Sequence, residues 1–586
     1  MSNEKRTEPY IERVDDLPLL FGLLQQMRIQ AILDEVIRPH GNWQGLSPGW
    51  VISMWLIHIL SEQNHCMEPV QQWVGHHLVT LQRLSGQEIR PLDFSDDRLA
   101  LCLQAISKLA VWRAVEAQLG ATIIRVYRIT PQVARLDATV ATVSHDPEQH
   151  PLFQVGKAKN GQYETQFKLM LASLDPLGLP LVVDVTGGQR ADDPLYIPSY
   201  QRLKQMIPAA GLLIVGDSKM DALATLGTIV SGGDGYLTPL AWQKNEPELL
   251  ANLLAERAQA QIELTNIFLP EDVPDDGREP EPALAIAYGF ESSRLRQAEV
   301  AGQTITWTER LLVIRSYSYI QTMQQGLQRR LAKAEAALNK LTPPRAKGKQ
   351  QITNEASLLQ ALAQIEKKQR VAGLFNYNYD CQVEERQVRA YKDQPARTER
   401  RVRYQLTVSR NEAAIAQAEE QLGWRIYGAN ELDETDAPLT LTEAVLTYRD
   451  QYLAENNFRR LKGKFLSITP VYVQRDDHAQ GLFHLLSIGA RLLALGDYQA
   501  RQALAEEGAA AELSGVYRGN AKRGTGRPTT ERMLKAFEQI NLLLIPSGVS
   551  PAEQAACFVT PLSPVQERIL GLLGLSTDLY TTLQVG

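Results

Sequence analysis

The sequence predicts a multi-domain α/β protein, and three changes of pattern along the chain indicate it. Residues 11–130 carry apolar side chains at three- and four-residue spacing, which is typical of amphipathic helices. From about residue 131 the spacing falls to two, as in β-strands, and turn sequences separate the runs. Residues 241–438 mix both patterns. We therefore expect a helical N-terminal domain, then an α/β core, and a large mixed α+β insertion within that core.

Composition places the chain among globular proteins of a reducing compartment. Of its 586 residues, 44% are apolar and 22% are charged, which suits several packed domains. The four cysteines lie far apart without a CxxC pair, which excludes a zinc-ribbon spacing and a secreted disulfide framework. The charged N-terminus does not fit a signal peptide, and the longest apolar run, residues 50–60, is too short to span a bilayer. We expect a cytoplasmic protein with no membrane partner.

Residues 1–130 are expected to form the helical domain. Breaks at residues 41–49 and 90–97 separate its helices, and Ser47 and Ser95 stand there as candidate N-caps. The tryptophans of this region are interpreted as core residues rather than as a stacking platform. The residues of this domain indicate no chemistry.

Residues 131–240 are expected to form the first part of the core. The predicted strands span residues 133–145, 167–176 and 179–188. A helix at 196–209 and a buried strand at 211–217 follow them. This order of elements is typical of an RNase H-like core, in which the fourth strand lies parallel to the first.

Residues 241–438 are expected to interrupt this core with a helical hairpin and a small sheet. The charge of this insertion is divided. Residues 244–309 hold 5 Lys/Arg against 13 Asp/Glu, whereas residues 310–410 hold 20 against 8. Such a basic block, in a chain of net charge −6, indicates a polyanion contact on one surface. On charge alone, a solvated helical arm is the alternative.

The C-terminal part is expected to complete the core over residues 439–500, with a helix through Glu455, a short strand at 469–474 and a long apolar helix. Residues 501–586 then begin with a glycine-rich basic strap and return to a helical pattern. The cations of this strap are Arg518, Lys522, Arg523, Arg527 and Arg532, and its one acid is Glu531.

Three acidic residues are candidates for one site. Asp137 lies inside the first strand, where an ion is costly unless it is paired or bound to metal. Asp217 ends the fourth strand, at the edge where open α/β sheets place ligands. If these strands are parallel neighbours, the two carboxylates face each other and suit Mg²⁺ or Mn²⁺. Glu455 is expected to join them from a helix packed against that edge.

The helix around Glu455 is predicted to carry a stripe of polar side chains. Its members are Tyr448, Gln451, Glu455, Arg459 and Lys462. At about 100° per residue, all of them lie within about 80° of one another on one helix. An acid followed by cations one and two turns further on is suited to hold metal while the cations contact phosphates.

Other acids near this edge are given simpler interpretations. Asp184, Asp192 and Asp193 are predicted to be turn or cap residues, and Asp221 to support the site from outside. Trp424 is interpreted as a core residue rather than a platform for an unpaired base.

The motifs around the three acids resemble those of the DDE transposases encoded by bacterial insertion sequences. LDATVATV, GDSKMDA and YRDQYLAENNFRRLKGK follow in the family's order, with a large insertion before the last acid, as in the insertion-sequence-four superfamily. In that branch the last helix reads Tyr, two residues, Arg, three residues, Glu, six residues, Lys. Tyr448, Glu455 and Lys462 match this motif, and Gln451 occupies the arginine position. The N-terminal helical region is similar to the accessory domain of one subgroup.

The resemblance implies a transposase that acts on double-stranded DNA with two Mg²⁺ or Mn²⁺ ions. It implies that Asp137 bridges both ions, while Asp217 and Glu455 complete one site each. Water then cuts a transposon end, and the 3′-hydroxyl that remains attacks target DNA. A homodimer or larger assembly on two DNA ends is expected. The expected DNA contacts are Tyr448, Arg459, Lys462, Arg523 and Arg527.

Two other classes of function stay open on the sequence. A recombinase that uses Tyr448 as its nucleophile would cut without metal and leave a protein–DNA bond. A non-catalytic DNA binder derived from a transposase is the second, and Gln451 is the feature that favours it.

Overall fold

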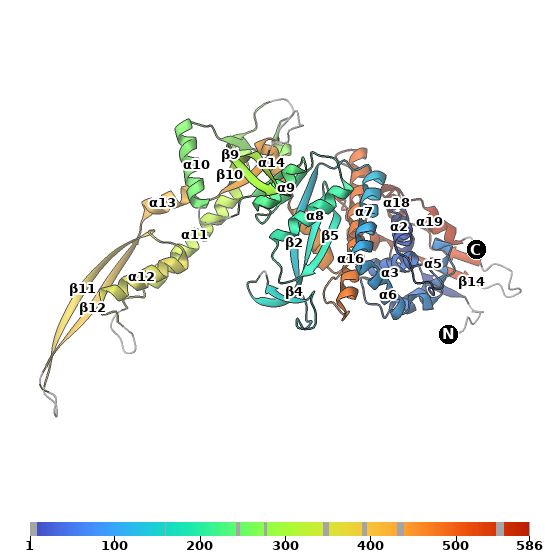
Figure 1. Cartoon of the computed structure of the whole chain (residues 1–586), viewed down its shortest axis with the longest axis horizontal. Coiled ribbons are helices and arrows are strands. Elements are labelled where there is room, and N and C mark those ends of the chain that lie inside the picture. Colours follow the sequence, from blue (N-terminus) through green and yellow to red (C-terminus); the bar gives the residue numbers. More distant parts are fainter. Residues whose placement is uncertain are drawn as a thin grey trace.

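The computed structural model describes residues 9–158, 160–241, 246–274, 278–343, 351–389, 395, 397–430, 439–545 and 556–584. It shows a mixed α/β protein with three parts in a row: a helical body that holds both ends of the chain, a central sheet, and a long arm (Figure 1). The predicted α/β class is confirmed. The predicted boundary at residue 438 lies outside the described residues.

The helical body is built from both ends of the sequence. Its N-terminal strand β1 (Tyr10–Arg13) pairs with β14 (Asn541–Ile545), which also pairs with β15 (Ala556–Val559). The sequence did not predict this small sheet, because each strand is short and its partner is remote. Before residue 130 the helices are α1 (Leu17–Gln26), α2 (Ile29–Val36), α3 (Pro48–Glu62), α4 (Val70–His76), α5 (Leu78–Ser85), α6 (Asp96–Ser107) and α7 (Leu109–Val126). After residue 475 they are α16 (Asp476–Glu507), α17 (Thr530–Leu534), α18 (Pro564–Leu572) and α19 (Asp578–Thr581).

Local sequence signals explain parts of this body. Ser47 caps α3 as predicted, since its hydroxyl accepts a hydrogen bond from the Trp50 amide at 3.5 Å. Ser95 occupies the N-cap position of α6 without a side-chain cap bond. Helix α16 is long and apolar enough to cross a bilayer, but 94% of its most apolar window is buried inside the protein, as in a core helix.

Among the described residues the central sheet has ten strands, and its first half matches the strands expected between residues 131 and 240. Strand β4 pairs antiparallel with β2 and β5, whereas β2, β6 and β7 are parallel neighbours. The fourth predicted strand thus lies parallel to the first, as expected. The bounds are β2 (Val133–Thr142), β3 (Gln154–Lys157), β4 (Tyr163–Leu174), β5 (Leu179–Gly187), β6 (Leu213–Gly216), β7 (Gly235–Pro239), α8 (Asp193–Met206) and α9 (Leu223–Ser231). The short strand β3, which pairs with β4, was not predicted.

The second half of the sheet comes from residues after 240. Strand β13 pairs antiparallel with β7 and continues the sheet through β10, β9 and β8. Most of the strands expected to form a small sheet in the insertion are therefore part of the core sheet. Their bounds are β8 (Thr265–Ile267), β9 (Ala287–Val300), β10 (Gln303–Ser316) and β13 (Trp424–Asn430), and the helices beside them are α10 (Glu246–Ala260) and α14 (Leu441–Arg449).

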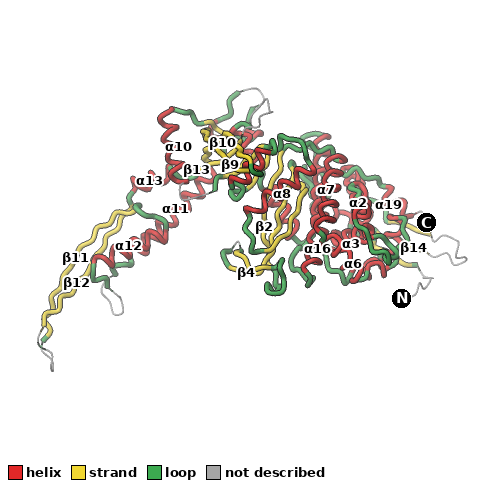
Figure 2. Tube along the Cα trace, viewed as in Figure 1, coloured by secondary structure: helices red, strands yellow, loops and turns green. Residues whose placement is uncertain are grey.

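The arm consists of a helical hairpin and a two-stranded ribbon that projects beyond it (Figure 2). The predicted helices are present, and Leu331 and Leu358 are fully buried in a core of their own between them. The ribbon strand β11 was not predicted, because most of its residues are exposed and its alternation of aromatic and polar residues is confined to its start. The bounds are α11 (Tyr317–Leu338), α12 (Glu355–Gln369), β11 (Phe375–Val388), β12 (Arg397–Arg410) and α13 (Glu412–Glu420).

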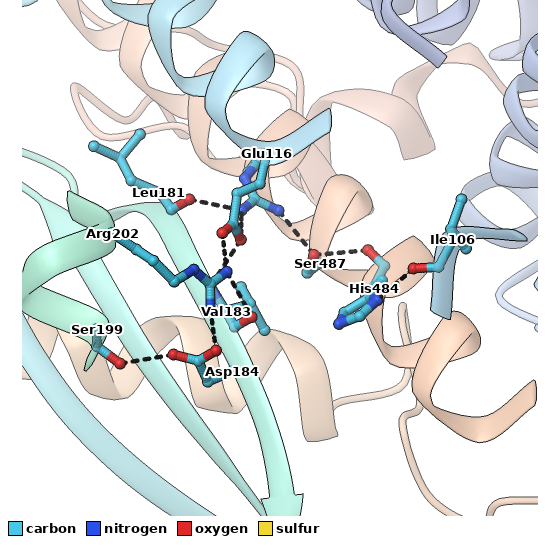
Figure 3. A network of polar contacts seen from close by, with 10 residues as sticks. Ile106, Glu116, Leu181, Val183, Asp184, Ser199, Arg202, His484 and Ser487 are labelled. Atoms are coloured by element: carbon cyan, nitrogen blue, oxygen red, sulfur yellow. Dashed lines mark hydrogen bonds and ion pairs between the residues drawn. The ribbon is translucent and has the colours of Figure 1, made fainter. Parts of the chain in front are cut away.

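A buried network of charged side chains joins the helical body to the sheet (Figure 3). Glu116 of α7 accepts hydrogen bonds from the Arg491 guanidinium of α16 and from the Val183 amide of β5, each at 2.8 Å. Arg202 of α8 pairs with both Glu116 and Asp184. The interpretation of Asp184 as a turn or cap residue is therefore wrong, since it lies inside β5 and pairs with a helix that follows it.

Candidate active site

Asp137 and Asp217 lie side by side on neighbouring parallel strands. In the register of β2 with β6, Leu136 is paired with Gly216; Asp137 is the next residue of β2, and Asp217 comes directly after the end of β6. Parallel neighbours are about 4.8 Å apart, and residues in register point to the same side of a sheet. Both aspartates are half-buried. The two carboxylates predicted to face each other thus occupy adjacent positions.

Tyr196 of α8 contacts one member of this pair, Asp217. Its hydroxyl donates a hydrogen bond to Asp217 Oδ1 at 2.7 Å, and the Lys219 amide donates to the same oxygen at 2.9 Å. Burial, together with the negative charges of Asp217 and Asp137, raises the pKa of Tyr196. Tyr196 therefore keeps its proton and remains a donor to Asp217. The sequence carried no signal for this residue, which the tertiary structure brings in from the preceding helix.

The segment that holds Glu455 is two helices rather than the single helix predicted. Helix α14 ends at Arg449, and α15 runs from Tyr452 to Lys462 after a turn in which Gln451 is the N-cap residue. The stripe predicted for one continuous helix is therefore interrupted between Tyr448 and Gln451. From Gln451 onward, the helical spacing holds.

Helix α15 runs alongside β2 and is attached to it at both ends. At its start, Arg135 donates a long hydrogen bond of 3.5 Å to the side-chain oxygen of Gln451. At its end, the Lys462 ammonium donates to Thr139 Oγ1 at 2.7 Å. Arg135 and Thr139 alternate with intervening residues along β2, so both point to the face that carries Asp137. The helix and the strand therefore run in the same direction over that face.

The spacing along both elements places Glu455 abreast of Asp137. Glu455 is four residues beyond Gln451, which is about 6 Å along a helix. Asp137 is two residues beyond Arg135, which is about 7 Å along a strand. On the helix, Gln451 and Glu455 differ by about 40° in direction, so Glu455 extends from the side that meets β2.

Two further contacts hold α15 in this position. The Asn457 side chain donates to the carbonyl of Gly178, in the turn between β4 and β5. Arg460 pairs with Asp497 of α16 at 2.6 Å and with Glu531 of α17 at 2.8 Å. Glu531, read in the sequence as the acid opposing the basic strap, instead holds this helix.

The donor chemistry of the edge suits a hard divalent cation, because carboxylate oxygens are the ligands that Mg²⁺ and Mn²⁺ prefer. Glu455 has an exposed side chain, whereas Asp137 and Asp217 are half-buried. Within the described ranges, no three acidic, histidine or cysteine side chains are close enough together to hold an ion. The structure thus brings two of the three predicted ligands together and leaves the third on the facing helix.

Two pockets meet at Tyr448, between the acidic edge and the second half of the sheet. One, of about 460 Å³, is lined by Glu455, Gln451 and Arg425 as well as Tyr448. The other, of about 750 Å³, is lined by Asp217 and Tyr448. Burial, then the charges of neighbours that include Asp217, raises the pKa of Tyr448, so this tyrosine is a poor source of a nucleophilic phenolate.

Trp424 belongs to the core, as predicted. Its ring packs edge-on against Tyr288 and Phe290 at centroid distances of 5.7 and 6.1 Å. Only 8% of it is exposed.

The acids around the edge have their own partners. Asp192 stands at the N-cap position of α8, yet its carboxylate pairs with Lys168 at 2.5 Å and with Lys219 at 2.7 Å. Asp193 is the first residue of that helix. Asp221 pairs with Arg296 of β9 at 3.2 Å and so connects the two halves of the sheet.

The remaining predicted DNA contacts lie on exposed surfaces. Arg459 is exposed on α15, and Arg523 and Arg527 are exposed in the strap. The Arg523 guanidinium lies over the ring of Tyr517 at 4.2 Å. Arg501 of α16 donates to the Pro528 carbonyl at 3.2 Å and pairs at 3.0 Å with Asp497, which also pairs with Arg460 of α15. The strap therefore passes close to the helix that carries Glu455.

Comparison with known proteins reaches only the helical body. A family described as a domain of unknown function, DUF4277, matches residues 10–115. Among curated proteins, no match to the chain is found. The family match ends before β2 and so does not include the acidic edge.

Proposed function

We propose that this protein is a DNA transposase of the DDE type, which cuts and joins DNA strands with Asp137, Asp217 and Glu455. The observation that carries the proposal is the arrangement of these residues. Two carboxylates stand in register on parallel strands, and the helix with the third lies along the same face. An ordinary structural role does not require like charges to be placed together without an intervening cation.

The strand order supports an RNase H-like core within the larger sheet. Strands β5, β4, β2, β6 and β7 are consecutive neighbours, with three antiparallel strands first in the chain and two parallel strands after them. The chain then leaves this core after β7 and returns in α14 and α15. This is the connection expected for a core with a large insertion before its last acidic residue.

In the proposed reaction each residue of the edge has a distinct part. Asp137, Asp217 and Glu455 would hold two divalent ions, which supply activation of the attacking oxygen and stabilisation of the leaving oxygen. Tyr196 holds Asp217 in place through its hydrogen bond, and Lys462 holds α15 against β2. Arg459 is exposed and lies one turn after Glu455. Since Lys462 anchors the helix, Arg459 is suited to contact a DNA phosphate.

The test is strand cleavage by Glu455→Gln on duplexes that carry the ends of the mobile element, in Mg²⁺. We expect cleavage to fall by about 1,000-fold, since the lost ligand is worth several kcal/mol, while DNA binding is kept. Glu506→Gln, an exposed acid on α16, is the matched control and should cleave normally. Equal cleavage by both variants would remove Glu455 from the active site, and absence of cleavage by the unsubstituted protein would leave a passive DNA binder.

A tyrosine recombinase predicts the opposite pattern. It would cut in EDTA, accumulate a covalent protein–DNA adduct, and lose both with Tyr448→Phe. Under our proposal Tyr448 is a DNA contact and not a nucleophile. We therefore expect Tyr448→Phe to form as much 3′-hydroxyl product per bound complex as the unsubstituted protein, and the unsubstituted protein to form no covalent adduct. The raised pKa of Tyr448 argues for this outcome.

A further inference from the structure

The arm carries the positive charge of the molecule. Residues 317–410 hold 18 Lys/Arg against 8 Asp/Glu, whereas the rest of the chain holds 43 against 59. This basic segment forms the part that projects furthest from the body (Figure 1). Its charge makes it complementary to a polyanion, and its position leaves it accessible to a large partner.

The outer part of the arm is a long ribbon whose strands pair only with each other. Strands β11 and β12 are each 14 residues long, or about 46 Å at the rise of a strand, and they form a two-stranded sheet of their own. Glu384 stands opposite Arg401, and Glu385 opposite Arg400. Opposite charges in register stabilise a pair of strands and keep it aligned where no core supports it.

The two faces of the ribbon differ. One face carries Tyr377, Leu406 and Val408, which pack against the hydrophobic core of α11 and α12. On this face the Tyr377 hydroxyl also donates to Glu366 of α12 at 2.8 Å. The helical hairpin therefore covers the apolar face and turns the opposite face outward.

The outward face is polar but not dominated by charge. Amide, hydroxyl and guanidinium groups make up most of it, and it contains no lysine among its described positions. Its exposed members are Asn376, Asn378, Asp380, Gln382, Glu384, Arg386, Arg401, Gln405, Thr407 and Ser409, and Arg403 on the same face is half-buried. A surface that only held phosphates would be richer in Lys and Arg.

We propose that this outward face enters the major groove of duplex DNA and reads base edges. The inference rests on the proposed function, for which it names the element that recognises sequence. The major groove admits a two-stranded ribbon, in which Asn and Gln pair with adenine and Arg with guanine. Exposed cations of the same arm, such as Lys367, Lys368 and Arg400, contact the phosphates, so positioning and reading fall to different residues of one arm.

The experiment is selection of binding sites by the full-length chain. The chain carries Asp137→Asn so that DNA is not cut, and the duplex pool is randomised over about two helical turns. The parent chain is expected to enrich a motif. Gln382→Ala with Gln405→Ala is expected to bind the selected duplex roughly 10- to 100-fold more weakly, with binding to unselected duplex unchanged. Methylation of guanine N7, which lies in the major groove, should interfere with binding by the parent chain.

Gln360→Ala with Gln364→Ala is the matched control, because it removes two exposed amides from α12 of the same arm. It should keep the motif and the affinity. Retention of the full motif by the ribbon variant, or failure of the parent chain to enrich any motif, would overturn the inference. A further outcome would also overturn it: the ribbon variant keeps the motif, but without DNA its mass in solution differs from that of the parent chain. The face would then be a contact between two copies of the chain.

These outcomes are distinguishable from failure of the proposed function. Selection measures binding by a chain with no cleavage activity, whereas the catalytic proposal is judged on cleavage of duplexes with Glu455→Gln. A chain that reads DNA through the ribbon but never cuts it would sustain this inference and overturn the other.

Discussion

The molecule holds two clusters of charged side chains: in one, opposite charges are paired, and in the other, like charges are adjacent. Glu116 and Asp184 alternate with Arg202 and Arg491, so every charge has an opposite partner and the cluster is closed. At the acidic edge, Asp137 and Asp217 are like charges in adjacent positions, with Glu455 on the facing helix. A closed cluster stabilises the joint between two parts of the fold. We call the second cluster open, because its like charges indicate a site suited to a cation.

The largest effect is expected from breaking the closed cluster. Glu116→Ala leaves two buried guanidiniums without a carboxylate between them, and we expect a loss of about 3–5 kcal/mol in the free energy of unfolding. Urea denaturation measures it. Glu506→Ala, on the exposed side of α16, should change stability by less than about 0.5 kcal/mol. Equal losses in the two variants would contradict the stabilising part assigned to Glu116.

The open cluster should respond to a cation instead. Mg²⁺ at about 100 times its dissociation constant should stabilise the unsubstituted protein by about 2.7 kcal/mol. Asp217→Asn removes one ligand and part of the repulsion, so stability without Mg²⁺ should not fall, and the gain on adding Mg²⁺ should be lost. Thermal unfolding with and without the ion measures both. A full gain in the variant would remove Asp217 from the proposed metal site.

Low pH should lower the free energy of unfolding through His484, a buried residue near the closed cluster. Burial lowers the pKa of His484 from 6.5 to about 3, and its Nδ1 lies 2.8 Å from the Ile106 carbonyl oxygen. Because the folded pKa is below the unfolded value, the unfolded chain binds the extra proton, and stability is lost as pH falls from 6.5 toward 3. At pH 5 the loss is about 2 kcal/mol. His484→Gln should flatten this part of the pH–stability curve, and an unchanged slope would contradict it.

The smallest effect is expected at Gln451. The structure gives a reason for glutamine there, since its side-chain oxygen accepts from Arg135, which is fully buried and paired with Asp175 at 2.7 Å. Gln451→Arg would place a second cation beside Arg135, and we expect it to cost about 1 kcal/mol. Gln451→Met, of similar size without charge, is the control and should cost less. If Gln451→Arg stabilised the protein instead, the charge of Arg135 would not be the reason for glutamine at position 451.

The comparison also explains where sequence reasoning worked and where it failed. The strand position of Asp137 was readable because an acid between Leu136 and Ala138 breaks a local pattern. The part played by Asp184 was not readable, since its partner Arg202 belongs to a later helix, which no local signal around Asp184 indicates. Glu116 likewise looks like an ordinary helix-surface acid until α16 covers it.

Longer-range features failed for the same physical reason. The small sheet of β1 with β14 and β15 depends on strands from opposite ends of the chain. The prediction of a strand at 469–474 was wrong, since this stretch forms no strand among the described residues. The break between α14 and α15 lies in a sequence with uninterrupted helical spacing, and contacts with β2 and the turn at Gly178 accompany it.

The amino-acid sequence by itself determined which segments are helical or extended, where positive charge gathers, and which acids stand in unusual positions. These properties depend on spacing between near neighbours along the chain. Only the tertiary structure decided that Asp137 and Asp217 share an edge, that the helix carrying Glu455 is tethered alongside β2, and that the basic segment forms a projecting ribbon. These features depend on contacts between remote segments, which no local pattern of side chains encodes.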